Sequence, residues 1–489
     1  MSGEQAIQSE WLISKQKNGI NIKAGLIQRT LDIATLENDN FSIKTTSIKV
    51  DNKHLLESPS ADLCVSFYLA NPNERPKGIS LETESGIIEQ ESSEIKGSDG
   101  LKVKYTANLE EEQEIQWIKR IEHDNGLNNI FRDINVKLEP FQQNRQRISI
   151  TLGNSKENRK KNYLQGVSVE INYEIYAFHP AIRKWIVIKN EGNNWVKIDN
   201  LILDRISLKK EYHKNNNFTP SERGACASII GKQNKHKTHG IILASEIPSV
   251  LRTIENNGTM AYTQKYFEWV LGPNEEFESE PIFHYAFMGK RTKTISAVSL
   301  PIDRCIEGEF KRFLENVVGI RAKPEKLPHP LWCTWSNFVA NINDENIRDM
   351  ADIASQCGFG CMQIDAGWAK SQGMSSWSAG SAEPHPVKFA KFKGTCDYIK
   401  SKGLNLGLWL SCFRELGTKD LIEMPNARSL PLVKRKFGFG MSYASDWRYY
   451  YADDVVRLIR EYGATYFKQD LTNIKYGDIA EGHDSRTKK

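Results

Sequence analysis

The sequence of 489 residues lacks the marks of several protein classes. No apolar run approaches the roughly 18 residues that cross a membrane. The start of the chain, MSGEQAIQSEWLISKQ, contains no apolar segment of a secretion signal. Neither a G-x-G-x-x-G motif nor a P-loop is present, so nucleotide cofactors have no support. We therefore expect a cytoplasmic protein with no membrane partner and no cofactor.

Charge of one sign and paired cysteines are also scarce. The 66 Lys and Arg residues nearly balance the 61 Asp and Glu residues, and a net charge of +5 is too small to indicate a nucleic-acid partner. The eight cysteines include no C-x-x-C pair and no histidine partner at metal-ligand spacing. We predict buried, reduced thiols and no metal site. The 11 tryptophans exceed what packing alone leads us to expect and suggest flat ligands such as sugars.

Residues 1–320 are predicted to form a β-sandwich domain. Residues 167–175 alternate strictly between apolar and polar side chains, as do residues 148–152, and this period is typical of strands with one buried face. Polar, turn-like clusters separate the runs. Many strands with short polar connections favour a sandwich. Residues 109–121 could instead form a helix.

The pattern changes at residues 321–330, where three prolines predict a linker. Beyond it, over residues 331–489, short apolar runs alternate with helical patterns that end at glycine. Asn343 is expected to cap the first of these helices. We predict an α/β domain with parallel strands joined by right-handed crossovers. The four strands are placed near 331–335, 361–365, 404–410 and 465–470.

Polar and aromatic residues follow these predicted strands. Asp365 and Asp470 directly follow the second and fourth runs, while Trp335 and Trp409 lie in or after the first and third. Carboxyl ends of parallel strands line the active site in such folds. Two carboxylates ringed by indoles suit a neutral, polyhydroxylated substrate, because carboxylates bind hydroxyls and perform acid/base or nucleophilic work. The alternative is that Asp470 only ends a strand or caps a helix.

These residues resemble those of the melibiase-type glycoside hydrolases, the group of bacterial α-galactosidases and plant raffinose synthases. Residues 361–368 (CMQIDAGW) are similar to the second-strand motif of that family. Residues 392–409 are similar to its second helix and third strand, and residues 459–470 (IREYGATYFKQD) to its nucleophile strand. Residues 173–185 more weakly resemble its N-terminal β-supersandwich. The resemblance implies a β-supersandwich followed by a (β/α)8 TIM barrel.

The resemblance also implies a role for several residues. Asp470 would be the catalytic nucleophile of a retaining α-glycoside hydrolase, most simply an α-galactosidase-like one, acting through a covalent glycosyl-aspartate. Lys468 would hold a ring hydroxyl and keep Asp470 ionised. Asp365 would bind hydroxyls of the terminal sugar, and Trp368 would form a wall of that subsite. The other residues expected to line the pocket are Trp335, Trp377, Trp409 and Arg414.

Several departures from the family pattern bear on specificity. Ala366 replaces the second aspartate of the strand motif, Gln469 replaces the tryptophan before the nucleophile, and Thr472 stands where the family has asparagine. Ala366 removes one acceptor for a sugar hydroxyl, which leaves the identity of the terminal sugar open.

Only four strand–helix units precede Lys489, whereas a closed barrel needs eight. We therefore expect a barrel truncated after strand 4, without the general acid/base, that turns over natural α-glycosides poorly. Two alternatives stay open: sugar transfer of the raffinose-synthase type, and an inactive carbohydrate-binding fragment. The expected partner is an oligosaccharide or glycoconjugate, and a homo-oligomer is compatible with the sequence.

Overall fold

The computed structural model divides into two compact units, which are described separately. The first unit holds the described residues through Gly319, and the second holds those from Pro330 onward. Apart from Pro330, the predicted linker lies outside the described residues, so the domain boundaries stay a prediction. The described residues are 10–36, 40–69, 119–123, 130–154, 164–214, 229–234, 239–246, 252–254, 258–262, 269–288, 305–319, 330–370, 381–412, 414, 424–430, 432–435, 438–441, 443 and 445–470.

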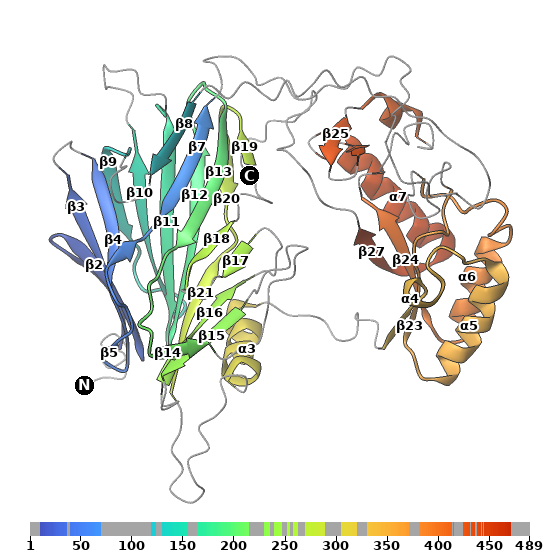
Figure 1. Ribbon diagram of the computed structural model, residues 1–489, viewed down its shortest axis with the longest axis horizontal. Helices are drawn as coiled ribbons and strands as arrows, with labels where there is room; N and C mark the ends of the chain where they lie inside the picture. The colour runs from blue at the N-terminus through green and yellow to red at the C-terminus, as the bar shows by residue number, and fades with distance from the viewer. Residues whose placement is uncertain are drawn as a thin grey trace, which may run out of the picture. The chain divides into compact units, whose positions relative to one another are not determined.

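The first unit contains three antiparallel sheets in its described part (Figure 1). One sheet has the order β1-β2-β3-β4-β5, with β6 beside β4. Its strands are β1 (Trp11–Gln16), β2 (Gly19–Ala24), β3 (Ile27–Thr35), β4 (Phe41–Val50), β5 (Lys53–His54) and β6 (Ser60–Ala61).

The largest sheet has the order β14-β15-β16-β21-β12-β11-β10-β9, with β20 beside β12. The third has the order β17-β18-β13-β7-β8, with β19 beside β13. Their strands are β7 (Cys64–Leu69), β8 (Lys119–His123), β9 (Asp133–Leu138), β10 (Arg145–Gly153), β11 (Val167–Tyr176), β12 (Ala181–Asn190), β13 (Val196–Asp204), β14 (Tyr212–Lys214), β15 (Ile229–Asn234), β16 (His239–Ser245), β17 (Arg252–Ile254), β18 (Met260–Tyr262), β19 (Trp269–Leu271), β20 (Glu275–Glu278) and β21 (Ile282–Met288).

The alternation of apolar and polar residues in the sequence predicts which side chains form the core of this unit. The apolar residues of β11 at 167, 169, 171, 173 and 175 are buried, as are those of β10 at 148, 150 and 152. They join one apolar cluster with residues of the other two sheets. The predicted helix at 109–121 is wrong at its end, because residues 119–121 belong to β8; its other residues lie outside those described.

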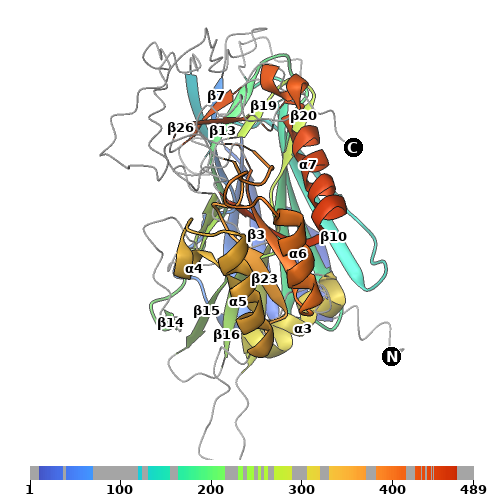
Figure 2. The same cartoon turned by 90° about the vertical axis from the view of Figure 1, so that its right-hand side faces the viewer.

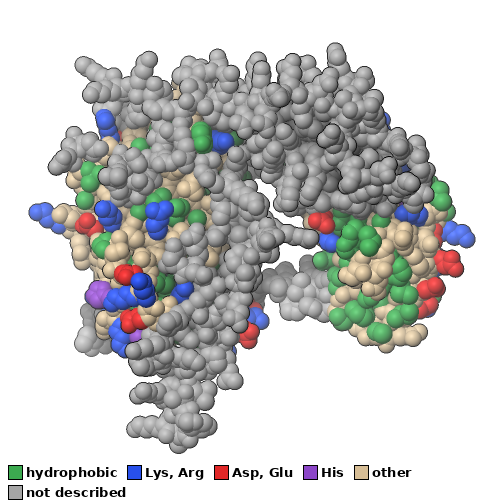
Figure 3. All heavy atoms as spheres, viewed as in Figure 1, with side chains coloured by type: hydrophobic (Ala, Val, Ile, Leu, Met, Phe, Trp, Pro, Cys, Tyr) green, Lys and Arg blue, Asp and Glu red, His purple; other side chains and the backbone are tan. Residues whose placement is uncertain are grey.

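A helical segment packs on the largest sheet. It is formed by η1 (Ile306–Phe310), α3 (Lys311–Phe313) and η2 (Leu314–Val318). Phe310 and Phe313 contact Phe283 and Tyr285 of β21 with ring centroids 5.2–6.0 Å apart. On the face shown in Figure 3, described basic and acidic side chains of this unit lie intermingled, without a field of one sign.

Charged residues at the centre of the first unit join its three sheets. Arg29 of β3 donates to Asp62, before β7, at 2.6 Å, and to Asp204 of β13 at 2.7 Å. Lys184 of β12 lies 3.3 Å from Asp62 and 3.7 Å from Asp204. All four side chains are at most 1% exposed. Buried charges need such partners, because leaving water costs several kcal/mol per ion.

The second unit is a parallel sheet with helices on one face (Figures 1 and 2). The order is β22 (Leu331–Cys333), β23 (Cys361–Ile364), β24 (Asn405–Ser411) and β27 (Ala464–Asp470), and every pair is parallel, as predicted. The helices are α4 (Trp335–Phe338), α5 (Asp344–Gln356), α6 (Phe392–Ser401) and α7 (Trp447–Tyr462); a 3-10 turn, η5 (Pro425–Ser429), and a hairpin of β25 (Leu432–Arg435) and β26 (Gly438–Met441) precede α7.

Local signals fix these helices. The Asn343 side chain accepts hydrogen bonds from the N–H groups of Glu345 and Asn346, which confirms the predicted cap of α5. Gly463 ends α7 with a left-handed φ of 74°. On α7, Leu458 and Tyr462 are buried, whereas Ile459 is 46% exposed. No described helix has the length and apolarity needed to cross a membrane.

Candidate active site

The two faces of the parallel sheet differ in chemistry. Residues paired across a sheet point to the same face, and successive residues along a strand alternate between faces. One face carries buried aliphatic residues of β23 and β24 and packs on the helices. The other face carries three successive rows of paired residues: Cys333, Gln363, Gly407 and Tyr466; then Trp409 and Lys468; then Ser411 and Asp470.

Lys468 lies between the two predicted site carboxylates. Its Nζ is 3.0 Å from Oδ2 of Asp365 and 3.7 Å from Oδ2 of Asp470. Asp365 directly follows β23 and is 1% exposed, whereas the Asp470 side chain at the end of β27 is 44% exposed. The arrangement therefore combines a buried acceptor with an accessible carboxylate beside one ammonium group.

Trp409 orients Asp470 from the neighbouring strand. Its indole Nε1 donates to Oδ2 of Asp470 at 3.1 Å, although the indole itself is only 2% exposed. Buried indole N–H groups need such an acceptor. Trp409 is therefore a buried hydrogen-bond partner of Asp470 and not the open pocket lining that was predicted.

Asp365 is held by a shell of donors. Its Oδ2 accepts from Gln363 Nε2 at 2.8 Å, from Lys468 Nζ at 3.0 Å and from Cys333 Sγ at 3.2 Å. Its Oδ1 accepts from the N–H of Ala366, and its own N–H donates to Thr334 Oγ1. Both carboxylate oxygens of Asp365 are therefore occupied by donors of the protein.

The charge states of these donors follow from their surroundings. Burial works against the charged form of Lys468, but its hydrogen bond to Asp365 and the charges of Asp365 and Asp470 outweigh it and raise the pKa of the lysine. Burial raises the pKa of the Cys333 thiol to about 11. At neutral pH the lysine is therefore a cation and Cys333 a neutral S–H donor.

Removing the lysine should destabilise this cluster. In Lys468→Met the buried carboxylate of Asp365 loses the ammonium group that lies 3.0 Å away. Because a buried polar group that loses its partner costs about 1–3 kcal/mol, we expect the second unit to lose about that much stability. Lys393→Met, at an exposed position of α6, serves as the control. Hydrogen exchange in β23 measures both variants, and equal losses would contradict the role of Lys468 as a partner of Asp365.

Two predicted pocket residues belong to the core instead. Trp368 is 0% exposed, stacks on Phe392 at 5.1 Å and donates from Nε1 to the carbonyl of Trp409. It has no free face for a sugar, so its predicted role as a subsite wall is wrong in this structure. Arg414 is 2% exposed and binds Asp454 of α7 at 2.8 Å, which makes it a structural ion pair.

The remaining predicted residues are placed less centrally. Trp335 begins α4 and packs partly buried against the core of the second unit. Trp377 lies outside the described residues. In the described part of the chain, no three His, Cys, Asp or Glu side chains gather in a way that could bind a metal ion.

Three residues around Asp365 were not predicted: Cys333, Thr334 and Gln363. Gln363 gave a signal, because a glutamine inside the apolar run CMQI needs a polar partner when the run is a buried strand. Thr334 and Cys333 lie at the end of the first strand, where site residues gather, yet neither residue type alone indicates a contact with Asp365.

The turn after Asp365 depends on Gly367. Its φ of +105° is one that other residues rarely adopt, and an added Cβ would lie 2.7 Å from the carbonyl oxygen of Ala340. We expect Gly367→Ala to destabilise the second unit by about 3 kcal/mol. Gly358→Ala is the control, because Gly358 has a φ of +78° with nothing within 4 Å, and it should cost only about 1 kcal/mol. Hydrogen exchange in β23 measures both, and equal losses would contradict the steric argument.

Comparison with known proteins confirms the resemblance to α-galactosidases. No family model matches the chain. The α-galactosidase Mel36A of Lactobacillus acidophilus is 26% identical over 145 residues, which cover 29% of this chain and 18% of that enzyme. An α-galactosidase of Oryza sativa subsp. japonica is 30% identical over 105 residues, which cover 20% of this chain and 23% of that enzyme. The matched part thus spans about a fifth of each relative.

Solved structures give the same likeness at the level of fold. The galactosidase domain of the α-galactosidase-sucrose kinase AgaSK has a TM-score of 0.52 and 12% identity, covering 96% of this chain and 68% of that one. The α-galactosidase of Lactobacillus brevis has a TM-score of 0.51 and 10% identity, covering 95% of this chain and 65% of that one. At these sequence identities the likeness shows a shared fold and says nothing of the substrate.

Proposed function

We propose that this chain carries the nucleophile and sugar-binding part of a retaining, α-galactosidase-like glycoside hydrolase site. The observation that carries the proposal is the placement of Lys468 between Asp365 and Asp470, 3.0 Å and 3.7 Å from their oxygens. The similarity to curated α-galactosidases supports the same class of reaction.

In this proposal Asp470 attacks the anomeric carbon of a terminal α-linked sugar. Its side chain is 44% exposed and can meet substrate, while Trp409 donates to one of its oxygens and Lys468 places a positive charge 3.7 Å away. The attack forms a glycosyl-aspartate, and water later releases the sugar with its original configuration. Asp365 is the other carboxylate of the cluster. Because it is 1% exposed and both of its oxygens already accept hydrogen bonds from the protein, we assign it to holding Lys468 beside Asp470 rather than to direct contact with substrate hydroxyls.

The proposed architecture follows from the same likeness. The three sheets of the first unit would form the β-supersandwich, and β22, β23, β24 and β27 would be successive strands of a (β/α)8 barrel. In a barrel the polar rows face the interior and the site lies at the carboxyl ends of the strands. Asp365 and Asp470 hold such positions at the ends of their strands.

An activated substrate tests this proposal without the general acid. Dinitrophenolate leaves without being protonated, so turnover of 2,4-dinitrophenyl α-galactoside reports the nucleophilic step. We expect turnover to exceed that of the matching α-glucoside, and proton NMR to show the α-anomer of the free sugar as the first product. First formation of the β-anomer would contradict a retaining mechanism. Saccharide binding without turnover would favour a carbohydrate-binding protein.

A further inference from the structure

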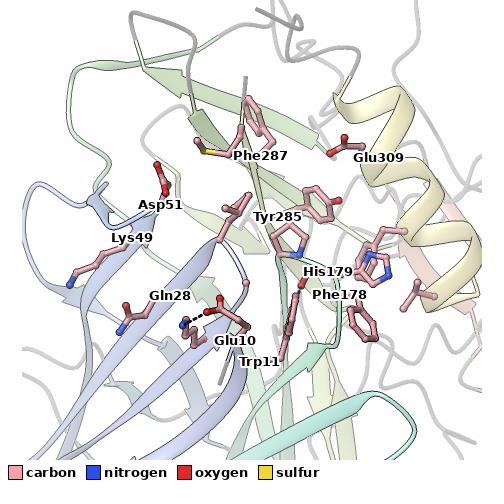
Figure 4. A pocket seen from close by; sticks show the side chains of 18 of the residues that line it. Glu10, Trp11, Gln28, Lys49, Asp51, Phe178, His179, Tyr285, Phe287 and Glu309 are labelled. Atoms are coloured by element: carbon pink, nitrogen blue, oxygen red, sulfur yellow. Dashed lines mark hydrogen bonds and ion pairs between the residues drawn. The ribbon is translucent and has the colours of Figure 1, made fainter. Parts of the chain in front are cut away.

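The first unit contains a cavity of about 920 Å³ that the proposed active site does not use. Its walls come from the turns after β2 and β4, the turn between β11 and β12, strand β21 and the helical segment (Figure 4). Tyr285, Phe287 and Phe313 line it and are nearly buried. The volume lies within the range of about 300–1,000 Å³ that small-molecule sites occupy.

Two aromatic side chains are fixed at this cavity before any ligand arrives. The rings of Trp11 and Phe178 lie 5.4 Å apart at an angle of 52°. The indole Nε1 of Trp11 donates to the carbonyl of His179 at 3.2 Å, and Gly25 leaves room beneath the ring, where a Cβ would come within 3.3 Å. A ligand stacking here would therefore not need to order the indole first.

Phe178 occupies a position that folding alone does not favour. Its φ is +69°, which is an outlier for a bulky side chain, and it is 60% exposed. Such a conformation is strained, and so exposed a ring recovers little of the strain energy by burial. Strain of this kind tends to persist where a residue serves binding.

The charged groups around the cavity balance one another. Glu10, Asp51 and Glu309 bring three negative charges, and Glu10 forms an ion pair with Lys23 at 3.2 Å. Burial lowers the pKa of His179, so its ring is neutral at pH 7. Three basic side chains offset the acidic ones: Lys23, Lys49 and Arg312.

We propose that this cavity is a binding site for a neutral saccharide, which stacks on Trp11 and Phe178 and is hydrogen-bonded by the polar groups around them. Aromatic faces accept the C–H faces of sugar rings, and carboxylates and amides such as Glu10 and Gln28 accept or donate to hydroxyls. A nucleotide would need a net positive site, and a lipid would need walls with fewer charges. This site is separate from Asp470 and goes beyond the proposed hydrolysis.

Fluorine NMR of the full chain containing 5-fluorotryptophan tests the proposal with raffinose as the probe. The Trp11 resonance is identified by its loss in Trp11→Phe. We expect raffinose to shift this resonance saturably, with a dissociation constant of about 1–10 mM. Phe178→Gly should weaken binding at least about tenfold, and glycine suits the backbone at φ +69°, so the variant should keep its fold.

Trp269 provides an internal control, because it is 44% exposed and pairs with Phe277 at 5.1 Å and 54° without lining this cavity. Its resonance should not respond. No shift of Trp11 up to about 50 mM raffinose, or equal shifts of Trp11 and Trp269, would overturn the proposal. The assay with the activated galactoside separates this proposal from the proposed hydrolysis. If the chain turns over that substrate while raffinose leaves the Trp11 resonance unshifted, the cavity proposal is refuted and the proposed hydrolysis stands.

Discussion

Asp470→Asn should lower turnover of 2,4-dinitrophenyl α-galactoside by at least about a thousandfold, or roughly 4 kcal/mol of transition-state stabilisation. The amide retains the shape of the side chain and an oxygen for the Trp409 indole, so the fold is preserved while the nucleophile is lost. Steady-state kinetics with purified protein measure the effect. Asp397→Asn, at an exposed position of α6, is the matched control.

Chemical rescue separates a nucleophile from an acid. In Asp470→Gly the space of the carboxylate is open, so added azide can attack the anomeric carbon in its place. A single displacement inverts the configuration, and the expected product is the β-glycosyl azide. Formation of the α-azide would instead indicate that Asp470 is the acid/base residue. Full activity in Asp470→Asn would exclude both roles.

Arg29→Met should be the most destabilising single change in the first unit. It leaves Asp62 and Asp204 buried with Lys184 as their remaining cation, and loss of one partner from a buried ion pair costs about 3–5 kcal/mol. Burial alone would raise the pKa of Asp204, but Arg29 and Lys184 outweigh it and hold that pKa well below its ordinary value. Circular dichroism melting of the full chain measures the loss.

The matched control is Arg183→Met, which removes an arginine from a partly exposed pair with Glu246 and should lower the stability less, by about 1–2 kcal/mol. The double variant Arg29→Met, Asp204→Asn removes charges of both signs. Its loss of stability should therefore be smaller than the sum of the losses in the two single variants. The pKa of Asp204 is depressed in the folded state. Its contribution to folding stability is therefore present at neutral pH and is lost as the pH falls through that folded-state pKa. Equal melting temperatures for Arg29→Met and Arg183→Met would contradict this account.

The sequence predicted elements better than it predicted contacts. The four parallel strands and the cap at Asn343 follow from local periodicity and from side chain-to-backbone hydrogen bonds, which neighbouring residues decide. The sequence also contains a signal for the buried charges, because charged residues stand at apolar positions of two strands. Arg29 lies between Ile27 and Leu31 on the apolar face of β3, and Lys184 occupies the same kind of position in β12. A charge on an apolar face predicts a buried partner, but not which one.

The site could be predicted only to the level of strand ends. Asp365, Lys468 and Asp470 were assigned from the motifs, and the structure brings their side chains together. Trp368 was misassigned, because an indole after a strand can turn either to a ligand or into the core, and packing on Phe392 decides between these. The donors around Asp365 come from different strands, so their convergence depends on register rather than on sequence spacing.

Peptide mapping by mass spectrometry after treatment with 5-fluoro-α-galactosyl fluoride tests the central claim most directly. Fluoride leaves without an acid, and the ring fluorine slows the later hydrolysis, so the covalent glycosyl-enzyme accumulates. We predict one added fluorogalactosyl group, located at Asp470 in the β27 peptide and absent in Asp470→Asn. A label on Asp365 or another residue, or labelling that persists in Asp470→Asn, would contradict the assignment.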